Sequence, residues 1–245
     1  MSAVVPENVA SESMSSGAGS RTGSLRPRQL ALALDHAESY AREDFLSGPC
    51  NEGALALVDA WPDWPARAIA LVGPEGSGKT HLATIWAAAA GARVASAHAL
   101  AEADLPAALA TGALVVEDAA AMADERALFH LINLAREEDA YLLFTARTVP
   151  PLWPASLADL MSRLRALPVV TLQAPDDAML RGVMVKLATD RQLPLDATVV
   201  AYLLNHIERS FAAARAAVIA LDKEALRQGR APSRALAAEL FRDTT

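Results

Sequence analysis

The sequence predicts an α/β fold with a five-stranded parallel sheet, followed by a small all-helical domain. Two observations indicate this arrangement. Short apolar runs alternate with helix-like stretches from about Tyr40 to residue 173, and beyond that point apolar residues recur at intervals of three and four. Strand–helix alternation is typical of parallel strands joined by right-handed crossovers. A chain of 245 residues has enough material for both parts.

The elements follow from these patterns in chain order. Strands are expected at the apolar runs 68–72, 93–97, 113–117, 141–145 and 169–172. Helices are expected between them, over 79–90, 99–110, 124–137 and 156–165. In the helical part, one helix face carries Leu180, Val183, Met184 and Leu187, and a second carries Val200, Leu203, Leu204 and Ile207. Asp196 is the expected N-cap of the second of these helices, and two more helices are expected over 211–226 and 233–241.

These patterns divide the chain into four predicted segments. Residues 1–24 are rich in Ser and Gly and poor in large apolar groups, so they bury too little surface to offset the entropy of ordering and are expected to be disordered. A short peptide over 25–36 follows, then the α/β domain over 37–173 and the helical domain over 174–245.

Composition excludes several classes of protein. The net charge of −7 and the absence of a Lys/Arg stripe argue against strong direct binding to DNA. A single cysteine, Cys50, excludes an internal disulfide and a multi-cysteine zinc site. Neither a secretory leader nor an apolar run of about 20 residues is present. The sequence therefore predicts a cytoplasmic protein without membrane contact.

The strongest motif is "GPEGSGKT", from Gly73 to Thr80, which matches G-x-x-x-x-G-K-[ST]. Its glycines, Gly73, Gly76 and Gly78, let backbone N–H groups turn inward with that of Ser77 and cradle phosphate oxygens at the start of a helix. Lys79 is expected to reach the β/γ-phosphates, and the Thr80 hydroxyl to hold Mg²⁺. The motif follows an apolar strand and opens a helix, which is the context it requires.

A pair of acids, Glu117 and Asp118, ends the strand expected at 113–117. In a P-loop fold one carboxylate at this position holds Mg²⁺, and the next polarises the attacking water. We assign Glu117 as the second Mg²⁺ ligand beside Thr80. Many strands end in acids, so a pair of solvated carboxylates is the alternative.

Two arginines carry alternative interpretations. Arg163 can act as an arginine finger on a neighbour's nucleotide, an effect worth about 10³–10⁵ in rate, or can be a solvated or ion-paired side chain. Arg215 can face the phosphates across a cleft between the two domains, or can point to water from an alanine-rich helix.

With these residues in place, the chain resembles the AAA+ family, and within it the branch of the bacterial initiator DnaA and its regulatory homologue Hda. "FLSGPCN" (45–51), "GKTHL" (78–82) and the spacing to "LADLMSRL" (157–164) carry the resemblance. It implies ADP or ATP with Mg²⁺ as cofactor, and it adds Asn51 and His81 to the nucleotide site. It also implies that Arg163 acts in trans on the ATP of DnaA.

The peptide "QLALAL" resembles the motif that binds the sliding clamp of DNA polymerase III. The amide of Gln29 can bond at a pocket rim while Leu30, Leu32 or Leu34 fill an apolar cleft. An amphipathic first helix over 29–40 is the alternative. The chain also ends near Phe241 without the basic helix-turn-helix domain of the initiator. The resemblance therefore implies two partners, DnaA and the clamp, and a role in preventing over-initiation of replication.

The chain departs from the family pattern at three places. Glu117 stands where an aspartate is common, "TARTVPP" (145–151) lacks the aspartate of the sensor region, and Ala212 occupies the usual sensor arginine position with Arg215 one turn later. These departures argue for weak or no ATPase activity of its own. A helicase loader with its own turnover and an adaptor that no longer binds nucleotide are the alternatives. The sequence leaves open which nucleotide is resident and whether the free protein is a homodimer.

Overall fold

The computed structural model describes residues 40–102 and 104–242. Its central feature is a parallel sheet of five strands within that part of the chain, in the order β2-β3-β4-β1-β5. The strands are β1 (Ala68–Val72), β2 (Arg93–Ser96), β3 (Ala113–Glu117), β4 (Tyr141–Ala146) and β5 (Val169–Thr171). The predicted fold class is confirmed. The predicted disordered tail over 1–24 and the peptide residues Gln29, Leu30, Leu32 and Leu34 lie outside the described residues.

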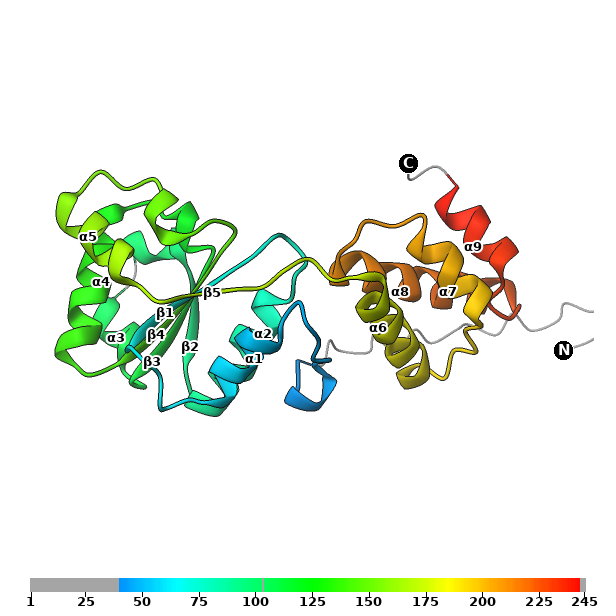
Figure 1. Ribbon diagram of the computed structural model, residues 1–245, viewed down its shortest axis with the longest axis horizontal. Helices are drawn as coiled ribbons and strands as arrows, with labels where there is room; N and C mark the ends of the chain where they lie inside the picture. The colour runs from blue at the N-terminus through cyan, green and yellow to red at the C-terminus, as the bar shows by residue number, and fades with distance from the viewer. Residues whose placement is uncertain (1–39, 103, 243–245) are drawn as a thin grey trace, which may run out of the picture. The chain divides into compact units, whose positions relative to one another are not determined.

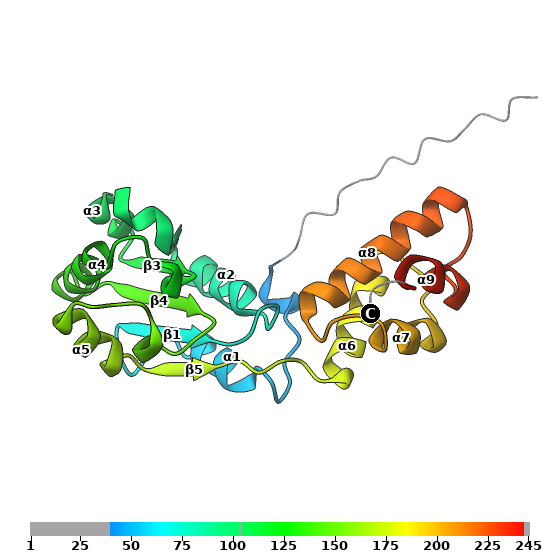
Figure 2. The same ribbon diagram turned by 90° about the horizontal axis from the view of Figure 1, so that it is seen from above.

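Helices cover both faces of the sheet because strand side chains alternate between them. Ile69 and Leu71 of β1 pack in one cluster with α1 (Glu52–Asp59) and α2 (Lys79–Ala90). Ala70 and Val72 face the other way, toward α4 (Glu125–Glu137) and α5 (Ala158–Ala166). Figure 1 shows these two layers of helices around the sheet, and Figure 2 shows the same arrangement from above.

The prediction of a single helix over 99–110 is wrong. The segment forms a 3-10 helix over Ala97–Glu102 and the short helix α3 (Leu105–Leu109). Asp104 caps α3 by accepting a hydrogen bond from the Ala107 N–H, and Pro106 lies in the first turn. Proline lacks an N–H and clashes with the carbonyl four residues earlier, so it is tolerated at a helix start but breaks a helix interior.

The register of the strands places functional segments along one edge of the sheet. Val72, the last residue of β1, lies opposite Ala146 of β4 and Thr171 of β5. Glu117, the last residue of β3, lies opposite Ser96 of β2. The P-loop, the acidic pair and the loop after β4 therefore all begin at the carboxyl edge, where open α/β sheets bind ligands.

Beyond residue 173, four helices of the described chain form a second core. They are α6 (Asp177–Asp190), α7 (Ala197–Leu204), α8 (Phe211–Gln228) and α9 (Arg234–Phe241). Leu180, Leu203, Val218 and Leu236, one from each helix, are fully buried together. The predicted cap of α7 is confirmed, since Asp196 accepts hydrogen bonds from the N–H groups of Thr198 and Val199. Among the described residues, no helix combines the length and apolar character that crossing a membrane requires.

Candidate functional site

The P-loop has a backbone that depends on its glycines. Gly76 and Gly78 adopt positive φ angles of 69° and 94°, which side chains rarely allow. A Cβ atom on Gly73 would lie 2.6 Å from the Leu172 carbonyl oxygen. The loop leads into α2, which begins at Lys79. The predicted strand–loop–helix context of the motif is therefore present.

Lys79 is buried beside this loop. Its Nζ donates hydrogen bonds to the carbonyl oxygens of Gly73 and Pro74, at 2.9 and 2.7 Å. Burial lowers the pKa of the Lys79 ammonium below its ordinary value, and the negative charge of Asp118 opposes this shift. The structure thus brings a desolvated cation and the second acid of the predicted pair into electrostatic contact.

The two acids of the pair, Glu117 and Asp118, lie in different environments. Asp118 adopts a left-handed conformation with φ of 51°, and its N–H donates to the Thr145 hydroxyl at 3.1 Å. Asp118 also lines a cavity of about 430 Å³ together with Ala146, Arg147 and Thr148. Glu117 is half-buried at the end of β3 and does not line either of the two cavities described in residues 40–242. The two carboxylates therefore face different surroundings although they are adjacent in sequence.

An ion pair spans the loop after β4 and the P-loop. The Arg147 guanidinium lies 2.7 Å from a Glu75 carboxylate oxygen, and both side chains are exposed. Arg147 occupies the segment in which the family pattern has an aspartate. Its charge also contributes to lowering the pKa of Lys79. This edge of the sheet thus carries a positive group beside the P-loop.

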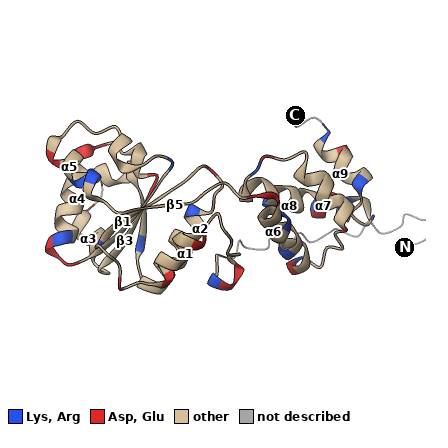
Figure 3. Ribbon diagram, in the orientation of Figure 1, with Lys and Arg blue, Asp and Glu red and all other residues tan. Residues whose placement is uncertain are grey.

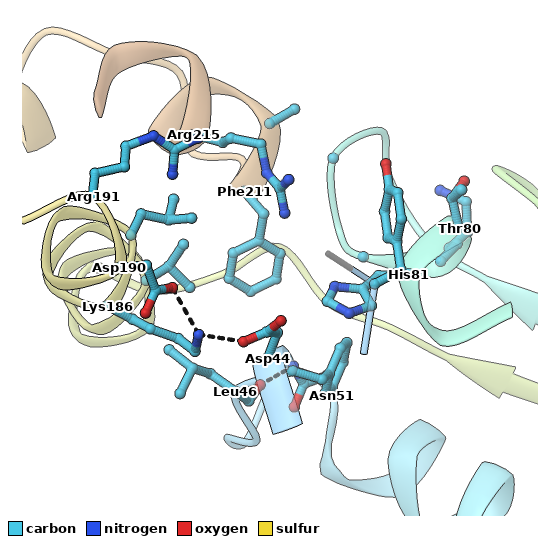
Figure 4. Close-up of a pocket in the computed structure, with 18 residues that line it drawn as sticks. Asp44, Leu46, Asn51, Thr80, His81, Lys186, Asp190, Arg191, Phe211 and Arg215 are labelled. Atoms are coloured by element: carbon cyan, nitrogen blue, oxygen red, sulfur yellow. Dashed lines mark hydrogen bonds and ion pairs between the residues drawn. The ribbon is translucent and has the colours of Figure 1, made fainter. Parts of the chain in front are cut away.

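A larger cavity of about 580 Å³ opens beside the P-loop. One wall comes from Gly76 with Gly78–His81, a second from Tyr40 and Asp44–Leu46 with Asn51, and the third from α6 and α8. Figure 4 shows Arg191, Arg215 and Phe211 on the helical side and Thr80 and His81 on the P-loop side. The His81 ring packs edge-on against the rings of Tyr40 and Phe45, at centroid distances of 5.2 and 5.1 Å.

Ion pairs close the side of the cavity remote from the P-loop. Lys186 of α6 lies 2.5 Å from an Asp44 oxygen and 2.9 Å from an Asp190 oxygen, as Figure 4 shows. The hydrogen bonds that its ammonium donates to these carboxylates raise the pKa of Lys186. The contact joins the segment before α1 to the helical part of the chain.

The helical part also meets the P-loop directly. The N–H of Phe211, the first residue of α8, donates to the Gly76 carbonyl oxygen at 2.9 Å. A Cβ atom on Gly76 would lie 2.5 Å from the Cβ of Ser210, the N-cap of α8. The absence of a side chain at position 76 therefore permits this close approach.

Solved structures share this arrangement of sheet and helices. Domain III of the Thermotoga maritima replication initiator DnaA matches with a TM-score of 0.69 at 18% identity, covering 84% of this chain and 96% of that one. AMPPCP-bound DnaA from Aquifex aeolicus matches with a TM-score of 0.60 at 19% identity, covering 78% and 70%. The Thermotoga maritima RuvB branch migration motor matches with a TM-score of 0.67 at 15% identity, covering 83% and 72%.

The chain has the fold of DnaA domain III and of RuvB. No protein-family model and no curated protein matches the sequence. At identities of 15 to 19% the likeness concerns the fold, and the roles of single residues depend on the geometry of this chain.

This fold gathers most of the predicted nucleotide-site residues around one cavity. Its lining includes Asn51, Gly76, Gly78, Lys79, Thr80, His81 and Arg215. Arg215 lies in the cavity wall, with its guanidinium 5.9 Å from the centre of the Tyr40 ring, and not in the solvent-facing orientation that its alanine-rich helix allows. Asn51 is buried, and its amide donates to the Leu46 carbonyl oxygen and accepts from the Gly48 N–H. It shapes the loop that forms the second wall.

Besides Glu117 and Asp118, three predicted residues lie apart from this cavity. Gly73 and Ser77 lie within the P-loop but do not line the larger cavity. Arg163 is half-buried on α5, with its guanidinium 5.5 Å from the centre of the Phe129 ring, and lines neither cavity of the described chain. Within residues 40–102 and 104–242, no three His, Cys, Asp or Glu side chains come together as a metal site.

Sequence reasoning missed part of the cavity wall. Asp44 and Lys186 form its ion pair, and Phe211 supplies both an aromatic face and the backbone contact to the P-loop. The segment "FLSGPCN" indicated that the chain before α1 matters, but nothing in the local pattern pairs residue 44 with residue 186. Such partners become visible only when the fold brings the two segments together.

Proposed function

We propose that this protein is a nucleotide-binding AAA+ regulator that promotes hydrolysis of the ATP bound to the initiator DnaA. The observation that carries nucleotide binding is the cavity of about 580 Å³ bounded by the P-loop, by Tyr40 with Asp44–Leu46, and by helices α6 and α8. Its volume and its mixture of aromatic and charged lining suit a nucleotide. AMPPCP is bound to DnaA in two structures of the same fold.

The P-loop residues fit a phosphate chain. The Ser77 hydroxyl is buried and has no hydrogen-bond partner among the described residues, although buried polar groups normally have one. Lys79 is a buried cation held by carbonyl oxygens at the same loop. We assign the phosphates of ADP or ATP to the loop Gly73–Gly78 with Lys79, and Mg²⁺, which neutralises phosphate charge, to Thr80 with Glu117.

The departures from the family pattern support a weak hydrolytic activity of this chain. The segment 145–151 lacks the aspartate of the sensor region, and Arg215 lines the cavity one turn after the usual sensor position, which Ala212 occupies. Bound ADP or ATP then serves to hold the α/β part and the helical part together. We infer that the chemistry on which the protein acts takes place on its partner.

Arg163 is the residue that we assign to that partner. It lies on α5 and lines neither of the cavities described in this chain, so a contact between its guanidinium and a phosphate would involve another molecule. An arginine supplied in trans stabilises the charge that develops during phosphoryl transfer. DnaA holding ATP is the partner that the resemblance implies.

The test uses DnaA preloaded with radiolabelled ATP, this protein, the sliding clamp and DNA. We expect clamp-dependent hydrolysis with wild type, loss of that hydrolysis with Arg163→Ala, and no loss with Arg165→Ala, an exposed arginine on the same helix. Hydrolysis by this protein alone, with no effect on DnaA, would overturn the proposal and favour the helicase-loader alternative.

Recruitment by the clamp is a separate part of the proposal. We assign it to Gln29, Leu30, Leu32 and Leu34, which precede the described residues. The variant Leu32→Ala with Leu34→Ala should lose clamp binding and keep its nucleotide affinity, whereas Leu25→Ala should keep both. Unchanged clamp binding in the double variant would remove the peptide from the proposal.

A further inference from the structure

The start of α5 lacks a capping side chain of its own. Its N-cap residue is Leu157, whose side chain carries no hydrogen-bonding atom. The first N–H groups of a helix need acceptors, and polar N-cap residues usually supply one. The structure instead holds the two residues before the helix, Ser156 and Leu157, through another element.

That element is α4, through the carboxylate of Glu125. One oxygen accepts from the Ser156 N–H at 2.6 Å and from the Leu157 N–H at 3.1 Å, and the other accepts from the Ser156 hydroxyl at 2.7 Å. These hydrogen bonds lower the pKa of Glu125, so the group is ionised at neutral pH. A negative charge at this position also favours the N-terminal end of the α5 dipole.

The same face of α4 also contacts Arg163, further along α5. Phe129 lies one turn after Glu125, and residues four apart on a helix are neighbours. The Arg163 guanidinium lies 5.5 Å from the centre of the Phe129 ring, within the range of a cation–π contact. Glu125 therefore fixes where α5 begins, and Phe129 supports the arginine that α5 carries.

Helix α4, which carries Glu125 and Phe129, also follows the acidic end of β3 in the chain. Helix α4 is the first α-helix after Asp118, and Asp124 caps it by accepting from the Arg126 N–H. A rigid helix thus runs from the loop that follows Asp118 to both contacts with α5. The long side chain of Arg163 loses less freedom on reaching a partner when its helix start and its ring contact are already fixed.

We propose that Glu125 is a positioning residue for Arg163, acting through the backbone of Ser156 and Leu157, with Phe129 as the second support. The proposal rests on the proposed function of Arg163 in trans. It assigns no contact between Glu125 and the partner's nucleotide. The Glu125 carboxylate should affect hydrolysis of the partner's ATP only when Arg163 is present.

The test measures DnaA-bound ATP hydrolysis with Glu125→Ala, Arg163→Ala and the double variant, each at saturating protein. We expect Glu125→Ala to lower the stimulated rate between about 10- and 100-fold, because misplacement of a catalytic group by about 1 Å has effects of that size. In the Arg163→Ala background the same change should lower it no further. Glu137→Ala, an exposed acid of the same helix, is the matched control.

Two further variants keep the test independent of folding. Glu125→Gln retains one acceptor oxygen and replaces the other with a donor, and Phe129→Leu keeps apolar volume without an aromatic face. Both should reduce the stimulated rate while nucleotide affinity and thermal midpoint stay near those of wild type. Equal losses in the presence and absence of Arg163, or no loss from any of the three single variants, would overturn the positioning role. An unstimulated wild type or an active Arg163→Ala would instead overturn the proposed function.

Discussion

At the scale of single residues, the P-loop combines two groups that are costly to bury. Lys79 is an ammonium group taken out of water, and its partners within the loop are neutral carbonyl oxygens. Burying a charge against neutral acceptors recovers only part of its hydration free energy. The Ser77 hydroxyl nearby lacks a partner in the described chain. Such unsatisfied groups are expected at a site whose ligand supplies the missing contacts.

Replacing Lys79 with methionine should therefore abolish nucleotide binding without lowering the stability of the folded protein. We expect the Lys79→Met variant, without nucleotide, to have a free energy of unfolding equal to or above that of wild type. The rise in thermal midpoint that nucleotide produces in wild type should be lost. Lys223→Met, at an exposed position of α8, is the control that should keep the rise. A nucleotide-dependent rise in Lys79→Met would contradict the assignment of the phosphate site.

The lowered pKa of Lys79 also predicts a pH dependence. The folded chain binds this proton less tightly than the unfolded chain, whose lysine titrates near 10.5. Unfolding free energy contributed by this group should therefore rise as pH increases from the folded pKa toward 10.5. Urea titrations at several pH values should show this rise in wild type and a flatter profile in Lys79→Met. The same slope in both proteins would contradict it.

Glu224 near the end of α8 predicts a pH dependence of the same direction in the acid range. Hydrogen bonds from Arg227 and Gln228 lower its pKa to about 2, against an ordinary value of 4.5. Its contribution to stability is present above pH 4.5 and is lost as pH falls toward 2. Glu224→Gln should therefore flatten the acid limb of the stability profile in this range, measured by thermal unfolding. Glu224 is partly buried, but its partner Arg227 is exposed and the pair is screened by solvent, so we expect a small change.

At the scale of elements, side-chain caps define the helical part of the chain. Asp176, Asp196, Ser210 and Ser233 each accept a hydrogen bond from an N–H in the first turn of the helix that they precede. The short helix α7 has only eight residues, so its cap satisfies a large share of its exposed donors.

Removing the cap of α7 should destabilise the protein measurably. Asp196→Ala leaves the N–H groups of Thr198 and Val199 without their acceptor, and we expect a loss of about 1 kcal/mol in the free energy of unfolding. Asp196→Asn keeps an acceptor oxygen and should recover most of it. Urea unfolding of the three proteins checks both expectations. Equal stability of Asp196→Ala and wild type would show that α7 is held by packing alone.

The elements also show which strands and helices local sequence patterns can predict. Apolar runs and helical spacing predicted each strand to within a residue at its ends, and the helical spacing beyond residue 173 predicted the four helices there. Pro106 overrode the alanine-rich pattern that had suggested one helix over 99–110. Helix α1 was not predicted, although Asn51 at its start belongs to a motif that the sequence singled out.

Some residues of the candidate site could likewise be predicted from the sequence, and others could not. The P-loop is a contiguous motif, so its residues could be predicted from sequence. The Lys186–Asp44 contact joins residues 142 apart, and the support of Arg163 by Phe129 joins neighbouring helices. Neither has a sequence pattern, since both depend on which helices pack together. Tertiary partners of this kind require the fold.

At the scale of the whole molecule, the described chain from residue 40 onward builds one cavity from segments that are far apart in sequence. The charged groups around it belong to both signs, and Figure 3 shows Lys and Arg interspersed with Asp and Glu over the described elements. A cavity with three walls changes shape whenever one wall moves. The contacts between walls should therefore govern how tightly nucleotide is held.

The hydrogen bond from Phe211 to Gly76 is the contact that tests this expectation. Phe211 is the first residue of α8, where proline is tolerated, and Ser210 before it is extended with φ of −141° and ψ of 151°, as the residue before a proline prefers. Phe211→Pro therefore deletes the donor while permitting the helix, and Phe211→Ala deletes the ring while keeping the donor. A net hydrogen bond contributes about 0.5–1.5 kcal/mol, so nucleotide affinity should be about 2- to 12-fold weaker in Phe211→Pro than in Phe211→Ala. Titration with a fluorescent ADP measures the difference, and circular dichroism checks that α8 persists. Equal affinities of the two variants would mean that the walls are held together by side chains, with the Lys186–Asp44 ion pair as the next contact to remove.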